Sequence, residues 1–222
     1  MSKHFVTEKT LSKKTGEWME RIRSRNIHKR PFDIQKAALL VIDMQRYFLE
    51  ESKHGHTPAA EAVIPNIQRL ISIFRDSKRP VIFTRHAHNK DGSDLGILKE
   101  WWDEMPVDGT PEAEIDPQLK PLSNETVLTK NRYSAFYNTD LDKILRTKSV
   151  KEVVITGVMT NICCESTARD AFFRDYFVRF VADGTGSIKE EMHVATLLNL
   201  AYAFADICTT DELVDQVSRS AG

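Results

Sequence analysis

Short apolar runs rich in β-branched residues alternate along this chain with longer amphipathic stretches, and this alternation is the feature that most constrains its fold. The apolar runs predict strands, and the amphipathic stretches between them predict helices. One such stretch, 60–78, spaces its apolar residues at steps of four, three and four, as one face of a helix requires: Val63, Ile67, Leu70 and Phe74. The expected strands are 37–43, 80–85, 125–130, 151–158, 176–182 and 205–210, and the other expected helices are 140–148, 161–175 and 189–203.

Strands that are apolar along most of their length and are separated by helices predict a parallel sheet covered on both faces, because each right-handed crossover lays its helix on the sheet. The predicted fold class is therefore α/β, a doubly wound three-layer α/β/α sandwich with a mainly parallel six-stranded sheet. A dinucleotide-binding protein shares this pattern, but no Gly-x-Gly-x-x-Gly follows the first expected strand. The stretch 86–124 breaks the alternation with several prolines and the pair Trp101 and Trp102, and we expect it to form a cleft wall.

The 222 residues are enough for one large domain with a sizeable core. Residues 1–36 are rich in charge and carry a helical pattern near Trp18, Ile22 and Ile27. We interpret 1–36 as an N-terminal arm that packs on the domain or on a neighbouring subunit, and 37–222 as the domain itself.

Charge and cysteine content exclude several classes of partner. Lys and Arg number 31 against 32 Asp and Glu, and no dense basic cluster is present, so neither nucleic acid nor an anionic membrane surface is an expected partner. No apolar run is longer than 37–42, which is far shorter than the roughly 20 residues that span a bilayer. Three cysteines, two of them adjacent, suit a reducing compartment better than a disulfide framework, which predicts a cytoplasmic protein.

Three polar residues lie at or just beyond the ends of expected strands. Asp43 closes the first strand, Lys130 closes the third, and Cys163 follows the fourth in the first turn of an expected helix. In an open parallel sheet, ligands bind outside the carboxyl ends of the strands, so the three side chains are expected to converge there. A thiol at a helix N-terminus also meets unpaired N–H groups that favour the thiolate.

Each of these residues has a simpler interpretation. Asp43 would serve equally well as a turn or helix-cap residue, Lys130 as a solvated surface lysine, and Cys163 as a small buried apolar residue. Taken together, they provide a nucleophilic thiol, a carboxylate that can accept its proton and a lysine that balances the charges. This combination indicates acyl-transfer chemistry.

The same residues lie in motifs by which the chain resembles the isochorismatase-like cysteine hydrolases, with their Rossmann-like fold. The most specific motif is 157–171, Gly-Val-Met-Thr-Asn-Ile-Cys-Cys-Glu-Ser-Thr-Ala-Arg-Asp-Ala, which places Cys163 at the position of the catalytic cysteine. Asp43 in Val-Ile-Asp-Met-Gln and Lys130 in Lys-Asn-Arg-Tyr-Ser-Ala-Phe match the other members of an Asp-Lys-Cys triad. The segments 109–115 and 133–141 are further family-like blocks, and the resemblance spans about 37–214.

The resemblance implies several further properties. It implies a cis peptide bond between Val158 and Met159, and an oxyanion hole formed by the backbone N–H groups of Met159 and Cys163. It also implies a homodimer or homotetramer that acts on a small molecule without a cofactor.

The sequence differs from two branches of the superfamily, and these differences reduce the number of reactions that we expect. Isochorismatases proper cleave a vinyl ether and lack the cysteine, so Cys163 argues against that reaction. Nicotinamidases carry an Asp-x-His and a further histidine that bind a metal, whereas this chain has His86 and His88 with no aspartate in the motif. Two histidines two residues apart on a strand face the same side and could hold a metal. With no third ligand evident, we expect no metal and assign both residues to hydrogen bonding or substrate contact.

The motifs are most similar to the ureidoacrylate and N-carbamoylsarcosine amidohydrolase branch. The sequence therefore predicts a hydrolase that cleaves a C–N bond of a small amide, ureido or carbamoyl compound through a thioester. The alternatives are an isochorismatase-type vinyl-ether hydrolase, a nicotinamidase-like amidase and a non-catalytic binding module. The expected substrate contacts are Gln45, Phe48, Arg85, Tyr133 and Trp101 or its neighbour Trp102.

Overall fold

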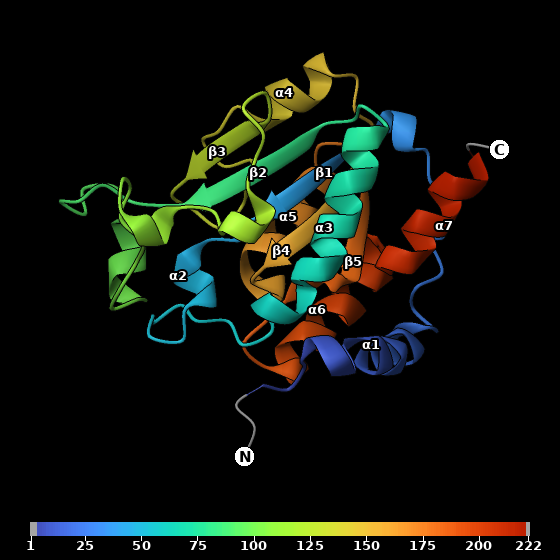
Figure 1. Cartoon of the computed structure of the whole chain (residues 1–222), viewed down its shortest axis with the longest axis horizontal. Helices are drawn as coiled ribbons and strands as arrows, with labels where there is room; N and C mark the ends of the chain where they lie inside the picture. The colour runs from blue at the N-terminus through green and yellow to red at the C-terminus, as the bar shows by residue number, and fades with distance from the viewer. Residues whose placement is uncertain (1–3, 221–222) are drawn as a thin grey trace.

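Six parallel strands form a single sheet at the centre of the computed structural model, which describes residues 4–220 (Figure 1). The strand order is β3-β2-β1-β4-β5-β6. This is the expected class, and the sheet is parallel throughout. The strands are β1 (Ala37–Ile42), β2 (Val81–His86), β3 (Thr126–Lys130), β4 (Glu152–Val158), β5 (Phe177–Gly186) and β6 (Asp206–Cys208).

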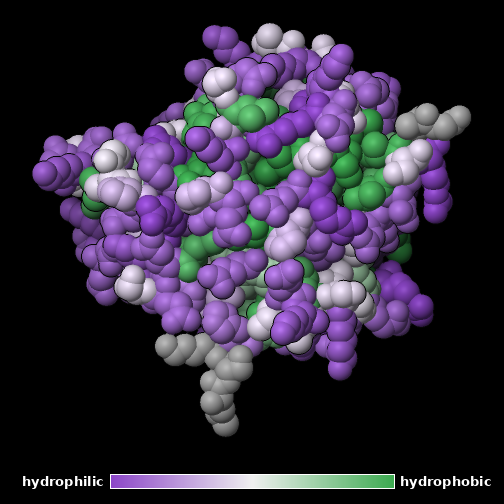
Figure 2. Space-filling model, in the orientation of Figure 1, coloured by the Kyte–Doolittle hydropathy of each residue, from purple (hydrophilic) through white to green (hydrophobic). Residues whose placement is uncertain are grey.

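Helices cover both faces of the sheet, with α3 in front of it and α5 behind it in Figure 1. The face seen in Figure 2 is mostly hydrophilic, because the apolar side chains are gathered in one core around the sheet. Within residues 4–220, no helix is both long and apolar enough to cross a membrane. The helices are α1 (Glu8–Ile22), α2 (Arg46–Leu49), α3 (Ala60–Asp76), α4 (Leu141–Thr147), α5 (Glu165–Phe172), α6 (Glu190–Ala203) and α7 (Thr210–Ser220).

The strand order reverses at β1, which lies between β2 and β4. Neighbouring strands end at the same height in the sheet. Ile42 at the end of β1 pairs with Gly157 of β4, and His86 at the end of β2 pairs with Lys130 of β3. The residues that follow these strand ends therefore lie at one edge of the sheet. In doubly wound folds, the point where the strand order reverses is the usual place for a ligand site.

Gly157 is required where β4 approaches β1 most closely. Its φ of +106° lies in the region that only glycine adopts readily, and a Cβ at this position would overlap the Ile42 carbonyl oxygen. We expect Gly157→Ala to lower the free energy of unfolding by about 3 kcal/mol or more in a urea titration. The matched control is Gly16→Ala in α1, where a Cβ meets nothing within 4 Å and should raise stability by about 0.5–1 kcal/mol. Equal stability of Gly157→Ala and the wild type would contradict this packing.

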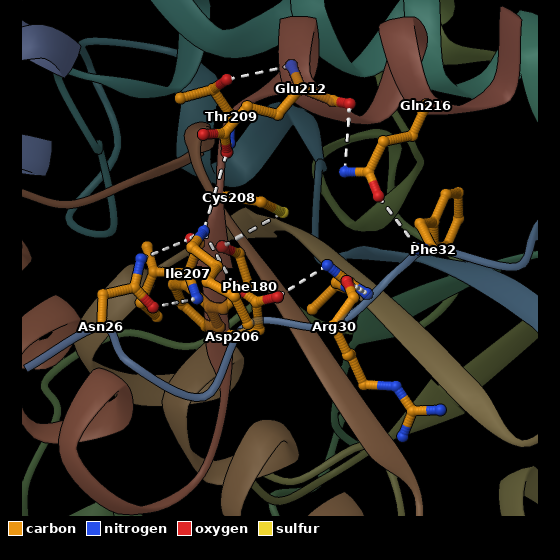
Figure 3. Close-up of polar contacts among 12 residues, drawn as sticks. Asn26, Arg30, Phe32, Phe180, Asp206, Ile207, Cys208, Thr209, Glu212 and Gln216 are labelled. Atoms are coloured by element: carbon orange, nitrogen blue, oxygen red, sulfur yellow. Dashed lines mark hydrogen bonds and ion pairs between the residues drawn. The ribbon is translucent and has the colours of Figure 1, made fainter. Parts of the chain in front are cut away.

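The N-terminal segment packs on the same core as the sheet. Trp18 and Ile22 are fully buried, but Ile27 lies beyond the end of α1 and is 70% exposed, so including it in the helical apolar face was wrong. After α1, Asn26 donates to the Ile207 carbonyl and accepts from the Ile207 N–H, which pairs this segment with the edge strand β6 (Figure 3). The division between an arm and a domain at residue 36 stays a prediction, and residues 1–3 and 221–222 lie outside the described part.

A buried arginine ties the N-terminal segment to the amino ends of three strands. Arg179 of β5 donates to Glu152 of β4 at 2.5 Å and to Asp206 of β6 at 2.6 Å. Its remaining terminal nitrogen donates to the Arg30 carbonyl at 2.7 Å. This network stabilises the edge of the sheet opposite to the one where β1, β3 and β4 end.

His193 on α6 connects α1 with the turn that follows β4. Its ring lies 4.4 Å from the Trp18 ring, and its Nδ1 is 2.9 Å from Thr160 Oγ1. Burial lowers the pKa of His193 from 6.5 to about 4, so the ring is neutral in the folded protein at neutral pH.

Because His193 is buried, the free energy of unfolding depends on pH in the acid range. Between pH 6.5 and about 4, the unfolded chain takes up a proton at His193 that the folded chain does not, so stability falls as pH falls through this window. The expected loss from His193 is about 3 kcal/mol, to be measured by urea titrations from pH 4 to 7. His193→Gln should make the pH dependence shallower by one proton. The dependence that remains includes the contributions of His86 and His88, whose pKa values burial also lowers. An unchanged slope in this variant would refute the assignment.

Candidate active site

Asp43, Lys130 and Cys163 meet at the carboxyl edge of the sheet. Lys130 Nζ lies 2.7 Å from Asp43 Oδ2 and 3.4 Å from Cys163 Sγ. The side chains of Asp43 and Lys130 are fully buried, and Cys163 is 5% exposed. The structure thus brings together the three residues that the sequence singled out, with the ammonium next to both the carboxylate and the thiol.

The Asp43 carboxylate is held in one orientation. Asp43 follows β1 with a φ of +49°, a left-handed conformation that Asp tolerates better than most residues. Thr84 Oγ1 donates to Asp43 Oδ1 at 2.6 Å and accepts from the Asp43 N–H at 3.1 Å. Because Thr84 occupies Oδ1, Oδ2 is the oxygen that faces Lys130.

Burial decides the resting charge of Cys163. It raises the pKa of this thiol to about 12, although Lys130 acts in the opposite direction. Burial alone would lower the pKa of Lys130, but Asp43 and Cys163 raise it overall. Burial therefore favours an ammonium beside a neutral thiol in the resting site, and it opposes the preference for the thiolate that N–H groups at a helix N-terminus would give. A base must remove the thiol proton as attack begins.

The turn after β4 presents the thiol. The Val158–Met159 peptide bond is cis, as the resemblance implied, and one π-helical turn, Thr160–Cys164, leads into α5. The Met159 carbonyl accepts from the N–H groups of Ile162 at 3.1 Å and Cys164 at 3.2 Å. These bonds fix the conformation of the segment that carries Met159 and Cys163, both of which line the adjoining cavity.

The cavity next to Cys163 has a volume of about 100 Å³, well below that of a site for a drug-sized ligand. Its walls are mainly aromatic and aliphatic, and within residues 4–220 no lysine or arginine lines it. A larger hollow of about 580 Å³ lies at the opposite edge of the sheet, around Arg30 and Phe177, remote from the thiol. The small cavity is lined by Tyr47, Phe48, His54, Gly55, His86, Trp102, Glu104, Met105, Tyr133, Met159, Ile162, Cys163 and Ile188.

Three of the expected substrate contacts lie elsewhere. Gln45 is fully buried and uses its amide to bind the backbone of His86 and the Ala113 carbonyl, which makes it a structural residue. Arg85 is placed between Thr84 and His86 on β2, so strand alternation turns it to the other side, where it binds Asp108, Glu114 and Thr129. Trp101 is 72% exposed.

The other expected contacts do line the cavity. These are Phe48 and Tyr133, together with Trp102, whose Nε1 donates to the Tyr133 hydroxyl at 2.9 Å. Sequence reasoning missed His54, Met105, Ile162 and Ile188, which reach the cavity from separate loops and turns and share no pattern. Thr84 was missed as well, although a threonine near the end of an apolar strand was a usable signal.

A metal does not fit among these residues. Within the described part of the chain, one group offers three candidate ligands: Asp43, His86 and Cys163, with ligand atoms within 4.8 Å of one another. Lys130 Nζ contacts all three, at 2.7 Å, 3.3 Å and 3.4 Å respectively. A buried ammonium in contact with all three candidate ligands repels a cation.

Comparison with known proteins decides the family. The isochorismatase domain model matches residues 37–212. The chain belongs to the isochorismatase family. It is 41% identical to nicotinamidase 3 of Arabidopsis thaliana over 194 residues, which are 86% of this chain and 93% of that protein. It is 31% identical to the ureidoacrylate amidohydrolase RutB of Serratia proteamaculans over 210 residues, covering 84% of this chain and 85% of that protein.

The fold agrees with this family. A cysteine hydrolase from Pseudomonas syringae superposes with a TM-score of 0.82 and 29% identity, covering 86% of this chain and 97% of that structure. Members of the isochorismatase family are hydrolases that act on C–N or related bonds. The chain is accordingly a hydrolase of this family.

Proposed function

We propose that this isochorismatase-family hydrolase is a cysteine amidohydrolase that acts on small, uncharged, planar amides through a thioester on Cys163. The observation that carries the proposal is the position of the thiol, which forms part of the wall of a small aromatic cavity and contacts the buried Lys130–Asp43 pair. The similarity to nicotinamidase 3 supports the same substrate class, because nicotinamide is a neutral, planar amide.

The chemistry of the cavity wall argues for an uncharged substrate. Ureidoacrylate and N-carbamoyl amino acids carry a carboxylate, and a buried carboxylate needs a cation or several donors to replace its water. No lysine or arginine lines the cavity within residues 4–220, whereas Tyr47, Phe48, Trp102 and Tyr133 offer flat apolar surfaces. Aromatic walls of this kind pack well against a planar ring.

The reaction proceeds in two half-reactions. Asp43 accepts the thiol proton while Cys163 Sγ forms a bond to the amide carbon, and the oxyanion rests on the N–H groups of Met159 and Cys163. The C–N bond breaks, and Asp43 returns the proton to the departing nitrogen. Water then attacks the thioester and gives a proton to Asp43, the S–C bond breaks, and the proton returns to sulfur. Lys130 stabilises the thiolate and the carboxylate as each forms.

Ammonia release from matched amides tests this substrate class. We expect kcat/KM for nicotinamide and benzamide to exceed that for ureidoacrylate and N-carbamoylsarcosine by about 100-fold or more, since an unpaired buried carboxylate costs several kcal/mol. Ile188→Lys adds a cation to the wall and should shift the preference toward the two acids. Preference of the wild type for the acids would contradict the proposal.

Two further properties belong to this proposal. We infer a cytoplasmic location, supported by the free thiols of Cys163, Cys164 and Cys208. A homodimer or homotetramer, which the family resemblance implies, stays a prediction for size-exclusion chromatography with light scattering.

A further inference from the structure

A line of four polar side chains runs from the candidate active site toward the surface. His86 Nδ1 lies 3.3 Å from Lys130 Nζ, and His86 Nε2 lies 3.0 Å from His88 Nε2. His88 Nδ1 lies 3.3 Å from Asp94 Oδ1. The lysine and both histidines are 2% exposed, while the Asp94 side chain is 20% exposed. The line thus links the buried ammonium to a carboxylate near solvent.

These residues do not form a metal site of the kind that nicotinamidases carry. The Nδ1 of His86 faces an ammonium, and its Nε2 faces His88. Asp94 contacts the far nitrogen of His88, away from the point where the two rings meet. A cation between the rings would therefore have two ligands from this group, fewer than the three that a protein site usually supplies.

The chemistry of the four groups fixes which atom carries the proton at each contact along the line. Lys130 can only donate, so His86 Nδ1 must accept, and a neutral His86 then carries its proton on Nε2. This N–H donates to His88 Nε2, which leaves the His88 proton on Nδ1, facing the Asp94 carboxylate. Burial lowers the pKa of both histidines, and for His86 the charge of Lys130 lowers it further, which agrees with two neutral rings.

Asp94 is placed to stabilise this arrangement of protons on the two histidine rings. Its carboxylate accepts from the Asn89 N–H at 3.0 Å and from Asn131 Nδ2 at 3.3 Å. These donors lower its pKa although partial burial opposes them, so the terminal acceptor is charged. A charged carboxylate 3.3 Å from His88 Nδ1 favours, through its charge, the tautomer with the proton on that nitrogen, although the two groups are not aligned as a hydrogen bond.

We propose that His86, His88 and Asp94 are positioning residues, which fix both ring tautomers so that His86 holds one N–H of Lys130 and keeps the ammonium between Asp43 and Cys163. This proposal rests on the proposed function for its catalytic consequence. If His86 no longer accepts from Lys130, the ammonium keeps its hydrogen bond to the Arg132 carbonyl at 3.1 Å but loses its contact with His86 on β2. Misplacement of a catalytic group by about 1 Å can cost about 100-fold in rate.

Nitrogen NMR on the substrate-free protein labelled with ¹⁵N-histidine tests the tautomers independently of activity. We expect His86 protonated on Nε2 and His88 on Nδ1, with His86→Gln and His88→Gln used for assignment. Protonation of His86 on Nδ1, or a metal ion found stoichiometrically in the purified protein, would overturn the proposal. This experiment stands even if the substrate class is wrong.

Variants of the loop test the catalytic consequence. Asp94→Ala should abolish the single tautomer pattern and lower kcat about 10-fold with little change in KM, because Asp94 itself does not line the cavity. Asp94→Asn keeps an oxygen acceptor and should restore most of kcat. Asp91→Ala, which removes a bond to the Ser93 N–H in the same loop, is the matched control and should behave as wild type. Unchanged tautomers and kcat in Asp94→Ala would overturn the proposal.

Discussion

Cys163→Ala is expected to lower kcat for amide hydrolysis by at least about 10⁴-fold while leaving the protein folded. Within residues 4–220, Cys163 carries the one thiol that contacts Lys130 and lines the cavity, so its removal leaves no sulfur to form the thioester. Alanine fits the space of a small side chain, which keeps the expected change in stability small. Ammonia release and a thermal melt of the same preparation measure both quantities.

Two other buried cysteines provide matched controls. Cys164 is fully buried, and its Sγ lies 3.8 Å from the Thr156 carbonyl oxygen, while Cys208 belongs to β6. Cys164→Ala and Cys208→Ala remove the same group and should keep kcat within a few-fold. Turnover that persists in Cys163→Ala would exclude a thioester and favour direct attack by water, as in vinyl-ether hydrolysis.

The second large effect concerns the buried ion pair. Lys130→Met removes the ammonium and leaves the Asp43 carboxylate buried with Thr84 as its remaining side-chain donor. We expect the free energy of unfolding at pH 7 to fall by about 3–5 kcal/mol. We also expect kcat to fall by about 10³-fold or more, because the thiolate forms without a cation beside it.

A double variant separates stability from catalysis. Asp43→Asn combined with Lys130→Met removes both charges, so it should recover most of the stability lost in Lys130→Met while hydrolysis stays absent. Arg69→Met, which breaks an exposed pair with Asp211, is the control and should change stability by less than about 1 kcal/mol. If the double variant were no more stable than Lys130→Met, the two charges would not be coupled as the structure indicates.

Most of the sheet could be predicted from the sequence because its central strands are buried on both faces. β1 and β4 have no exposed positions, so they produce nearly continuous apolar runs that are visible in the order of residues along the chain. α7 was not predicted, because it follows the three-residue strand β6 and only its inner face meets the core, at Leu213 and partly Val217. The four-residue α2 is too short to show a helical period.

The grouping of Asp43, Lys130 and Cys163 was predictable for a related reason, since each residue lies at or just beyond a strand end and parallel strands end together. The cavity wall was not, because its residues come from loops whose paths depend on tertiary contacts. The choice of Arg85 failed on strand alternation, since a residue flanked by inward-facing Thr84 and His86 points away from them. Asp94 went unnoticed because its contact with His88 exists only once the loop has folded.

The central claim is that Cys163 forms a thioester, and competition between water and hydroxylamine tests it most directly. A primary amide and the methyl ester of the same acid should give one common acyl-enzyme, which hydroxylamine converts to a hydroxamate and water to the acid. The account predicts the same ratio of hydroxamate to acid from both substrates, and no hydroxamate with Cys163→Ala. Ratios that differ between the two substrates, or hydroxamate formed by the alanine variant, would contradict it.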